Sequence, residues 1–353
     1  MHIDDLLKKA VNMGASDLHI TTNVPPNIRV DGNLRQLPGG NLDREAVAAL
    51  MDQIIGEEHH RIFEERGEVD FSYAIFGLSR FRVNVFRQRG TPAMSIRIVP
   101  PKIMTPDELG LPEIVKTLAR RPYGLVLVTG PTGSGKSTTL AAMIDLLNQE
   151  NSGHIITLED PIEFLHTHKK SIVNQREIGI DSKTFASGLR AALRQDPDII
   201  LVGELRDLET ISTAITAAET GHLVFATLHT SNATQTVDRV IDVFPPHQQN
   251  QVRVQLSMIL QGIVAQTLIP RADREGRVVA VEVLVATPAV RNLIREGKTP
   301  QLNTVIQSSA KYGMQMMDNS LKDLYLRGII SYEEARKRAM DQDGFKRLVQ
   351  ESY

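Results

Sequence analysis

The sequence predicts an α/β protein in which a small α+β domain precedes a larger domain with a mostly parallel sheet. After Tyr123, apolar runs of the buried-strand type alternate with helical segments. Before Pro100, the strands alternate polar with apolar residues, which is typical of an antiparallel sheet with one buried face. Between them, residues 101–122 are rich in proline. We therefore expect domains at 1–100 and 123–353, with an interdomain linker carrying a short helix at 101–122.

The composition is that of an ordinary soluble globular protein, with 353 residues of which 41% are hydrophobic. The formal net charge of -2, from 40 basic and 42 acidic residues, gives no indication of a nucleic-acid partner. No apolar run reaches membrane-spanning length and the N-terminus lacks a signal-peptide pattern, so we expect a cytoplasmic protein. The absence of cysteine excludes disulfides, thiol catalysis and cysteine-based zinc sites.

The first domain opens with an amphipathic helix expected at Ile3–Met13. Asp31-Gly32 lies between two short alternating segments and predicts a hairpin turn. A single second helix is expected at about Asp43–Arg66. Three strands follow, with the sequences EVDFSYAIF, SRFRVNVFRQ and AMSIRIVP.

The second domain begins with a strand, Leu125–Thr129, followed by a glycine-rich loop and a helix at Thr138–Leu147. The loop has the pattern G-x-x-x-x-G-K-S, which is a P-loop. In such a loop, backbone N–H groups bind phosphates, the lysine reaches the terminal phosphates and the hydroxyl binds Mg²⁺. We therefore expect ATP and Mg²⁺ as ligands, with Ser137 on the metal. The predicted binding residues are Gly130, Pro131, Thr132, Gly133, Ser134, Gly135, Lys136, Ser137 and Thr138.

Further strands are expected at His154–Leu158, Ile199–Val202, Leu223–Thr227, Ile263–Ile269 and Val278–Val285. Ligands of parallel sheets bind at the carboxyl ends of the strands. Polar residues flank three of these strands: Glu159 and Asp160 in ITLEDPIEF, Glu204 in DPDIILVGELRD, and His222 and His229 in TGHLVFATLHT. We expect all of them at the edge of the sheet where the P-loop holds phosphate.

Glu204 is the candidate for polarising the attacking water, because phosphoryl transfer requires a positioned water and charge neutralisation. A surface salt bridge with Arg206 is the simpler interpretation. Gly203 stands where many P-loop enzymes carry an aspartate, so magnesium would rest mainly on Ser137, the phosphates and water.

Four other residues have less specific signals. Asp160 and Glu163 could hold water or magnesium, or could cap a helix. His229 could hydrogen-bond the γ-phosphate. His222 could do the same or could hold a neighbouring subunit, although a lone histidine often has only a structural role.

Two arginines of the first domain are also candidates. In SRFRVNVF, Arg82 lies on the strand face opposite Phe81 and Val83, and Arg97 lies opposite Ile96 in the same way. These arginines could be plain surface, or they could supply arginine fingers to a neighbour's triphosphate.

The P-loop and the three strand-end motifs, in this order, resemble those of the bacterial secretion ATPase superfamily. The resemblance covers the whole chain and implies a RecA-like ATPase domain preceded by a PAS-like domain. It also implies a homohexamer in which Arg82 and Arg97 reach the nucleotide of the next subunit. The segment AVRNLIREGK, Ala289 to Lys298, is similar to a signature of type IV pilus retraction ATPases, the PilT family, with Val290 in place of isoleucine.

The resemblance implies a motor that depolymerises a pilus, with an inner-membrane platform protein and an accessory retraction ATPase as partners. Assembly-type ATPases usually carry an additional N-terminal domain and a four-cysteine zinc element; neither is expected here. An accessory retraction ATPase, an assembly or type II secretion ATPase, and a nucleotide-gated scaffold with negligible turnover remain alternatives. Arg291, Arg295 and Glu296 are expected to project from a helix toward a partner, with Val290, Leu293 and Ile294 on its buried face.

Overall fold

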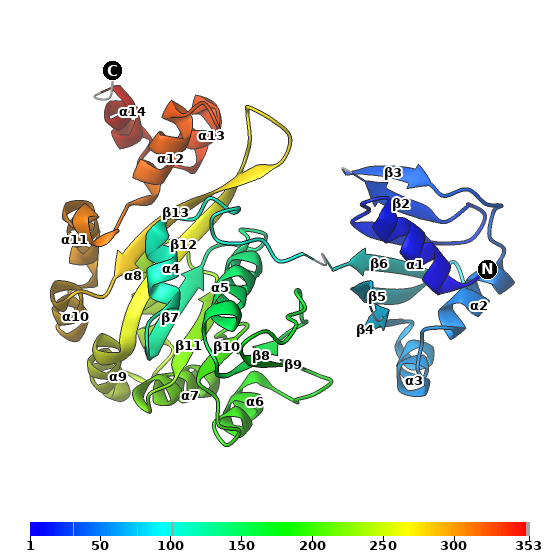
Figure 1. Ribbon diagram of the computed structural model, residues 1–353, viewed down its shortest axis with the longest axis horizontal. Helices are drawn as coiled ribbons and strands as arrows, with labels where there is room; N and C mark the ends of the chain where they lie inside the picture. The colour runs from blue at the N-terminus through cyan, green and yellow to red at the C-terminus, as the bar shows by residue number, and fades with distance from the viewer. Residues whose placement is uncertain (31, 76, 100–101, 351–353) are drawn as a thin grey trace. The chain divides into compact units, whose positions relative to one another are not determined.

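The computed structural model of the chain describes residues 1–30, 32–75, 77–99 and 102–350. The chain divides into two compact units, each with its own hydrophobic core. The first unit consists of Met1–Lys102 with Glu163–Leu165, and the second of Ile103–Ile162 with His166–Tyr353. The predicted fold class, a mostly parallel α/β unit preceded by a small α+β unit, is confirmed (Figure 1).

In its described residues, the first unit is an antiparallel sheet of six strands in the order β3-β2-β1-β6-β5-β4, with three helices. Its elements are α1 (Ile3–Asn12), β1 (Asp17–Ile20), β2 (Asn27–Val30), β3 (Asn33–Gln36), α2 (Arg44–Asp52), α3 (Glu57–Arg66), β4 (Glu68–Ile75), β5 (Ser79–Gln88) and β6 (Thr91–Ile98). Alternation decides which face is buried: Phe81, Val83 and Val85 of β5 are fully buried, whereas Arg80 and Arg82 lie on the other face.

Two details of the first unit differ from the prediction. The single helix expected at Asp43–Arg66 is two helices, because Gly56 adopts an extended conformation as the N-cap of α3 and interrupts the apolar period. Strand β1 was not predicted, since four residues give too short a pattern to recognise. The hairpin of β2 and β3 is present, with Val30 opposite Asn33. Of its predicted turn, Asp31 lies outside the described residues.

The second unit is built on a sheet of seven strands in the order β13-β12-β7-β11-β10-β8-β9. All neighbouring strands are parallel except β12 and β13. Its strands are β7 (Gly124–Thr129), β8 (His154–Glu159), β9 (Ile172–Glu177), β10 (Ile199–Val202), β11 (Leu223–Leu228), β12 (Leu260–Pro270) and β13 (Arg277–Val285). Central strands β7, β10 and β11 are buried throughout, as expected for a sheet covered on both faces.

The crossovers place the helices around this sheet. Its helices are α4 (Glu113–Ala119), α5 (Lys136–Glu150), α6 (Phe185–Ala192), α7 (Leu208–Glu219), α8 (Ala233–Asp242) and α9 (Pro246–Ile259). The step from β7 through α5 to β8 runs across the sheet in one direction, and the step from β10 through α7 to β11 runs in the other. Since such crossovers are right-handed, α5 and α7 cover opposite faces.

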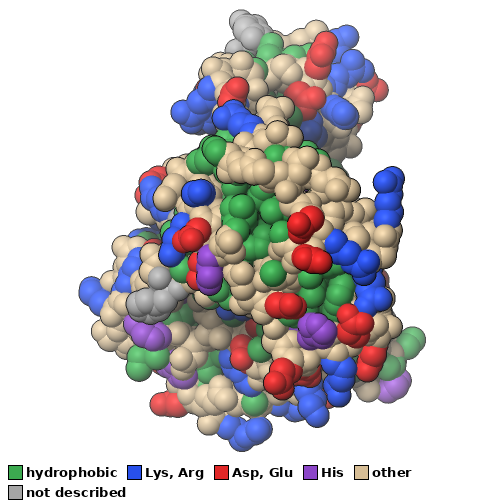
Figure 2. Space-filling view, turned by 90° about the vertical axis from the view of Figure 1, so that its right-hand side faces the viewer, with side chains coloured by type: hydrophobic (Ala, Val, Ile, Leu, Met, Phe, Trp, Pro, Cys, Tyr) green, Lys and Arg blue, Asp and Glu red, His purple; other side chains and the backbone are tan. Residues whose placement is uncertain are grey.

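Helices α10 (Pro288–Arg295), α11 (Leu302–Ser308), α12 (Met317–Leu326), α13 (Tyr332–Arg338) and α14 (Gln342–Gln350) complete the second unit. The last three pack on the hairpin of β12 and β13 around Ile269, Leu321 and Phe345. Basic and acidic side chains are intermixed on the face that Figure 2 draws, in keeping with the net charge of -2. Among the described residues, no helix is both long and apolar enough to cross a bilayer.

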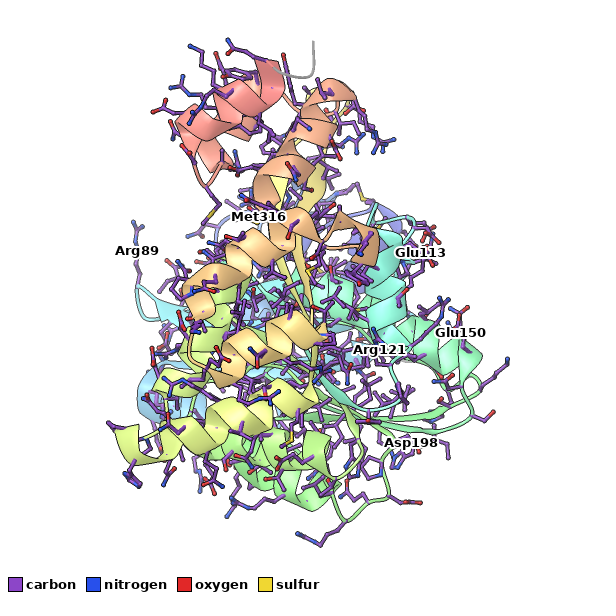
Figure 3. The ribbon with its side chains drawn as sticks, turned by 90° about the vertical axis from the view of Figure 1, so that its left-hand side faces the viewer. Arg89, Glu113, Arg121, Glu150, Asp198 and Met316 are labelled. Atoms are coloured by element: carbon purple, nitrogen blue, oxygen red, sulfur yellow. The ribbon has the colours of Figure 1, made fainter. Side chains whose placement is uncertain are left out.

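Residues 103–122, expected as a linker, contribute to the core of the second unit. Leu111, Val115 and Leu118 are buried in the same cluster as the central strands. Arg120, just after α4, places its Nη2 2.8 Å from Oε1 of Glu150 at the end of α5. Glu113 and Glu150 lie on these two neighbouring helices (Figure 3). This segment therefore packs as part of the second unit.

Candidate functional site

The loop between β7 and α5 has a backbone suited to holding phosphate. Gly130, Gly133 and Gly135 have φ of 143°, 77° and 89°, a region that favours glycine. A Cβ on Gly130 would lie 2.3 Å from the carbonyl oxygen of Gln266, so a side chain does not fit there. Because α5 begins at Lys136, its first N–H groups face the loop and can bind an anion.

The cation and the hydroxyl of the motif stand at the start of α5. The Nζ atom of Lys136 donates to the carbonyl oxygens of Gly130, at 2.8 Å, and Pro131, at 3.0 Å. These bonds hold the ammonium group across the loop. Ser137 and Thr138 follow in the first turn and are half-buried. The P-loop residues are therefore gathered at the carboxyl end of β7.

Glu204 and His229 meet at the same edge of the sheet, because each follows one of two adjacent parallel strands, β10 and β11. Glu204 Oε1 is 3.2 Å from Nε2 of His229, and Glu204 Oε2 is 2.7 Å from Nη2 of Arg206. The Glu204 side chain is only 18% exposed. The salt bridge with Arg206 is present, as the simpler interpretation expected, but the second carboxylate oxygen faces the histidine.

The surroundings of Glu204 keep it ionised. Burial by itself would raise the pKa of this carboxyl group, but the hydrogen bond with Arg206 and the charge of His229 outweigh burial and lower its pKa. A carboxylate can accept about four hydrogen bonds. Since Arg206 and His229 each engage one oxygen, acceptor capacity remains for a water molecule.

The close packing of β10 against β8 favours glycine at position 203. Its N–H donates to the carbonyl oxygen of Leu158 at 2.7 Å. A Cβ at this position would lie 3.1 Å from that oxygen and 3.3 Å from Cα of Glu159. An aspartate, as in many P-loop enzymes, would need a shift of this backbone.

The acidic residues at and after the carboxyl end of β8, Glu159, Asp160 and Glu163, lie in different surroundings. Glu159 accepts hydrogen bonds from the side chains of Thr157 and Gln175, at 2.6 and 3.1 Å. Asp160 is exposed, and its charge, after the larger effects of Glu204, helps to raise the pKa of Arg206. No helix lies between β8 and β9, all of whose residues are described, so the helix-capping interpretation of Asp160 and Glu163 was wrong. Glu163 belongs to the short segment that groups with the first unit.

His222 lies at the other end of β11 from His229. Its Nδ1 is 2.9 Å from the carbonyl oxygen of Ala217 and 3.1 Å from Oγ1 of Thr220, at the end of α7. Six residues of strand, about 20 Å, separate the two histidines. The expectation that both histidines stand at the phosphate edge was therefore wrong within one chain, and only His229 does.

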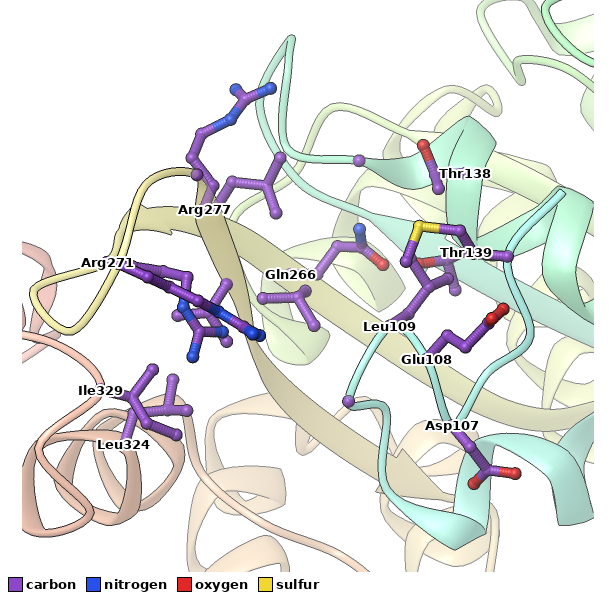
Figure 4. Close-up of a pocket in the computed structure, with 18 of the residues that line it drawn as sticks. Asp107, Glu108, Leu109, Thr138, Thr139, Gln266, Arg271, Arg277, Leu324 and Ile329 are labelled. Carbon is purple, nitrogen blue, oxygen red and sulfur yellow. The ribbon is translucent and has the colours of Figure 1, made fainter. Parts of the chain in front are cut away.

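A cavity of about 860 Å³ adjoins the P-loop, and no sequence pattern predicts it. Its lining includes Leu109, Gly135, Thr138, Thr139, Leu268 and Val279. In Figure 4, Gln266 of β12 lies between Thr138 near the start of α5 and the two arginines at the tip of the β12–β13 hairpin, Arg271 and Arg277. The cavity has the size typical of small-ligand sites and joins the phosphate-binding loop. It is therefore a candidate for the nucleoside part of a nucleotide.

In the first unit, four charged residues stand directly opposite one another across four strands: Arg29, Asp17, Arg97 and Arg82. The Nε atom of Arg97 lies 3.2 Å from Oδ1 of Asp17, which is 9% exposed. The Arg97 side chain is 70% exposed. This row presents net positive charge on the solvent-facing side of the sheet, with Asp17 holding one guanidinium group.

Comparison with known proteins adds to this geometry. The profile of the family described as "Type II/IV secretion system protein" matches residues 1–337. The type IV pilus retraction ATPase PilT of Pseudomonas aeruginosa is 51% identical, over 98% of this chain and 100% of that protein. The type IV pilus ATPase PilU of the same organism is 42% identical, over 99% and 91%. A crystal structure of the pilus retraction motor PilT with bound ADP superimposes with a TM-score of 0.92 at 49% identity, covering 98% of this chain and 99% of that chain.

Proposed function

The chain belongs to the type II/IV secretion system protein family, and from this premise we propose that it is a hexameric ATPase motor that powers type IV pilus retraction. The observation that carries the proposal is the 51% identity with a retraction ATPase over essentially the full length of both chains. The P-loop and the strand-end cluster supply the chemistry that such a motor requires.

ATP is the expected substrate, with its phosphates in the P-loop and its nucleoside in the adjoining cavity. Lys136 neutralises charge on the terminal phosphates. Glu204 accepts a hydrogen bond from the attacking water and orients it, while His229 and Arg206 hold the carboxylate in position. His229, through its contact with Glu204, is also suited to respond to the presence of the γ-phosphate.

The donor set suits Mg²⁺, which prefers a hydroxyl, phosphate oxygens and water over a cage of carboxylates. Among the residues that the structure describes, no three His, Asp or Glu side chains gather as a metal site. Ser137, in the first turn of α5, would hold the ion directly, and Asp160 would act through water. The ion would neutralise charge on the phosphates during transfer. Glu163 is a further candidate for holding water at this site.

In a ring, one subunit can supply positive charge to the nucleotide of the next. We place Arg82 and Arg97 as fingers that reach the nucleotide of the next subunit, where positive charge stabilises the transition state. His222, far from the P-loop of its own chain, would then act at a subunit contact or hold the end of α7. An inner-membrane platform protein and an accessory retraction ATPase are the proposed partners, at the cytoplasmic face of the pilus machine; no nucleic acid is involved.

The same-family alternative is an accessory retraction ATPase, which the 42% identity with PilU supports less strongly than the 51% identity with PilT supports the main proposal. A deletion strain separates them. Complementation of a strain that lacks its main retraction ATPase should restore twitching motility, and complementation of one that lacks only the accessory ATPase should not. The reverse pattern would favour the alternative.

Purified protein tests the enzymatic part of the proposal. We expect six-membered rings by electron microscopy and ATP hydrolysis that added DNA does not change. Lys136→Ala should weaken ATP binding by about tenfold or more, because a charge-assisted contact with phosphate is lost. Wild-type protein that binds ATP but turns over negligibly would instead indicate a nucleotide-gated scaffold.

A further inference from the structure

Gln266 is a buried polar residue on β12 whose side chain contacts the P-loop. Its side chain is 2% exposed, and its amide nitrogen donates to the carbonyl oxygen of Ser134 at 2.8 Å. Strand β12 pairs in parallel with β7, so Gln266 stands beside the strand that feeds the loop. In the sequence this residue is hidden within the apolar run IVAQTLI, and no motif marks it.

The contact between β12 and the loop is tight at two points. A Cβ added to Gly130 would lie 2.3 Å from the backbone oxygen of Gln266. A Cβ added to Gly135 would lie 3.2 Å from the Gln266 amide nitrogen. The strand therefore supports both the beginning and the end of the phosphate-binding loop.

The hydrogen bond fixes the orientation of one peptide group. In a planar trans peptide, the carbonyl of one residue and the N–H of the next point in opposite directions. Because the Ser134 carbonyl points at Gln266, the N–H of Gly135 must point away from β12. Gly135 immediately precedes α5, where backbone N–H groups converge on a bound anion.

We propose that Gln266 is a positioning residue that aims the Gly135 N–H at the phosphates of the nucleotide. The inference rests on the proposed function, in which the P-loop binds ATP. Gln266 does not touch the nucleotide's phosphates itself in this proposal. It acts through the Ser134–Gly135 peptide, so its loss should weaken nucleotide binding without removing any phosphate ligand.

Unpartnered polar atoms around Gln266 indicate that this residue has a role other than packing. In the described part of the chain, Gln266 Oε1 and Ser134 Oγ are buried side-chain atoms without a hydrogen-bond partner. A buried polar atom without a partner costs stability. An apolar side chain of similar size would remove the unpartnered Oε1, but it would also leave the buried Ser134 carbonyl without its donor. These two effects oppose each other, so glutamine gives little net gain in core stability, which indicates that its amide serves the loop.

Gln266→Met tests the proposal, because methionine keeps the length of the side chain and packs readily but cannot donate the bond. Gln266→Leu is a second such variant. The matched control is Gln261→Leu on the same strand. A Cβ added to Gly124 would lie 2.7 Å from the Gln261 amide nitrogen, so this glutamine stands beside the opposite end of β7 from the P-loop. For each protein we would measure the dissociation constant of ADP by titration and the midpoint of thermal unfolding without nucleotide.

We expect both Gln266 variants to bind ADP at least about tenfold more weakly, as for misdirecting one hydrogen bond to a charged group. Their unfolding midpoints should stay close to that of the wild type, because removal of the unpartnered Oε1 offsets the loss of the donor to Ser134. Gln261→Leu should bind ADP normally. In steady-state hydrolysis, KM should rise more than kcat falls, because the N–H contacts phosphate in the ground state as well as in the transition state.

Two outcomes would overturn the inference. One is ADP affinity within about twofold of the wild type in Gln266→Met. The other is loss of folded protein in both Gln266 variants, which would make the amide a structural requirement. Failure of the proposed function has a different signature, since wild-type protein and Gln261→Leu would then also fail to bind ADP.

Discussion

The Nε2 atom of His229 lies 3.2 Å from Oε1 of Glu204, and this contact joins the ends of two adjacent strands at the P-loop edge. The second carboxylate oxygen bonds Arg206. Two positively polarised partners thus fix the plane of the carboxylate, so the directions open to a water molecule are restricted. A carboxylate held in this way can orient water more effectively than one that rotates freely.

Glu204→Gln should leave ATP binding nearly unchanged and reduce turnover to less than about a tenth of the wild type. The amide keeps the shape of the side chain but is a poorer acceptor for the water. Binding would be measured by titration and turnover by phosphate release. Glu209→Gln is a matched control, because Glu209 forms an ion pair with Arg190 on the surface nearby. Turnover above a tenth in Glu204→Gln would contradict the water-positioning role.

The pH dependence of kcat follows from the lowered pKa of Glu204. A lowered pKa keeps the carboxylate ionised to lower pH, so this group should not limit the wild-type rate between about pH 5 and 8. Arg206→Ala removes the hydrogen bond that lowers the pKa, whereas burial, which raises it, remains. The acid limb of the profile should therefore move to higher pH in Arg206→Ala and stay in place in Arg190→Ala. An unmoved limb in Arg206→Ala would show that Arg206 does not tune this group.

The central strands of the second unit were predictable from sequence, because β7, β10 and β11 are short, mostly apolar runs. The P-loop motif lies between one of them and a helix. Contacts between segments that lie far apart in the sequence could not be predicted in this way. The direction of β11 decides that His229 reaches the P-loop and His222 does not. The hydrogen bond between Gln266 and Ser134 joins residues whose numbers differ by 132, so no local pattern indicates it. Strand β1 and the break between α2 and α3 at Gly56 were not predicted, because neither shows a clear periodic pattern of apolar residues.

Mixed rings can test whether Arg97 of one subunit acts on the nucleotide of the next. Arg97→Ala and Glu204→Gln rings should each be inactive, and mixed rings should recover part of the activity. Recovery is expected because an Arg97→Ala subunit keeps its own catalytic edge and can receive Arg97 from a Glu204→Gln neighbour. Mixing Lys136→Ala with Glu204→Gln should restore nothing, since neither subunit then has a complete P-loop edge. Failure to recover at any mixing ratio, with rings seen by electron microscopy, would argue against fingers in trans.

In the AVRNLIREGK segment, the two arginines have different surroundings. Helix α10 buries Val290 and Ile294, as predicted, but Arg291 does not project freely toward a partner. Its Nη1 donates to the carbonyl oxygens of Ser257 at 2.7 Å and Met258 at 2.5 Å, near the end of α9. Arg291 thus supplies donors to carbonyl groups that a helix end leaves without partners. The expectation that Arg291 and Arg295 share one role as partner contacts was therefore wrong.

Substitution of Arg291 should affect stability, whereas substitution of Arg295 should affect the transmission of force. Arg291→Ala should lower the free energy of unfolding by about 2 kcal/mol, because charged hydrogen bonds to the end of α9 are lost. Arg295 is exposed in the last turn of α10, so Arg295→Ala should leave the unfolding midpoint, the ring and most ATPase activity unchanged. We expect the same variant to stop pilus retraction in cells, because hydrolysis occurs at the strand ends while force must leave the ring through another surface. Normal twitching of a strain that carries Arg295→Ala at wild-type protein levels would show that this helix end does not transmit the force.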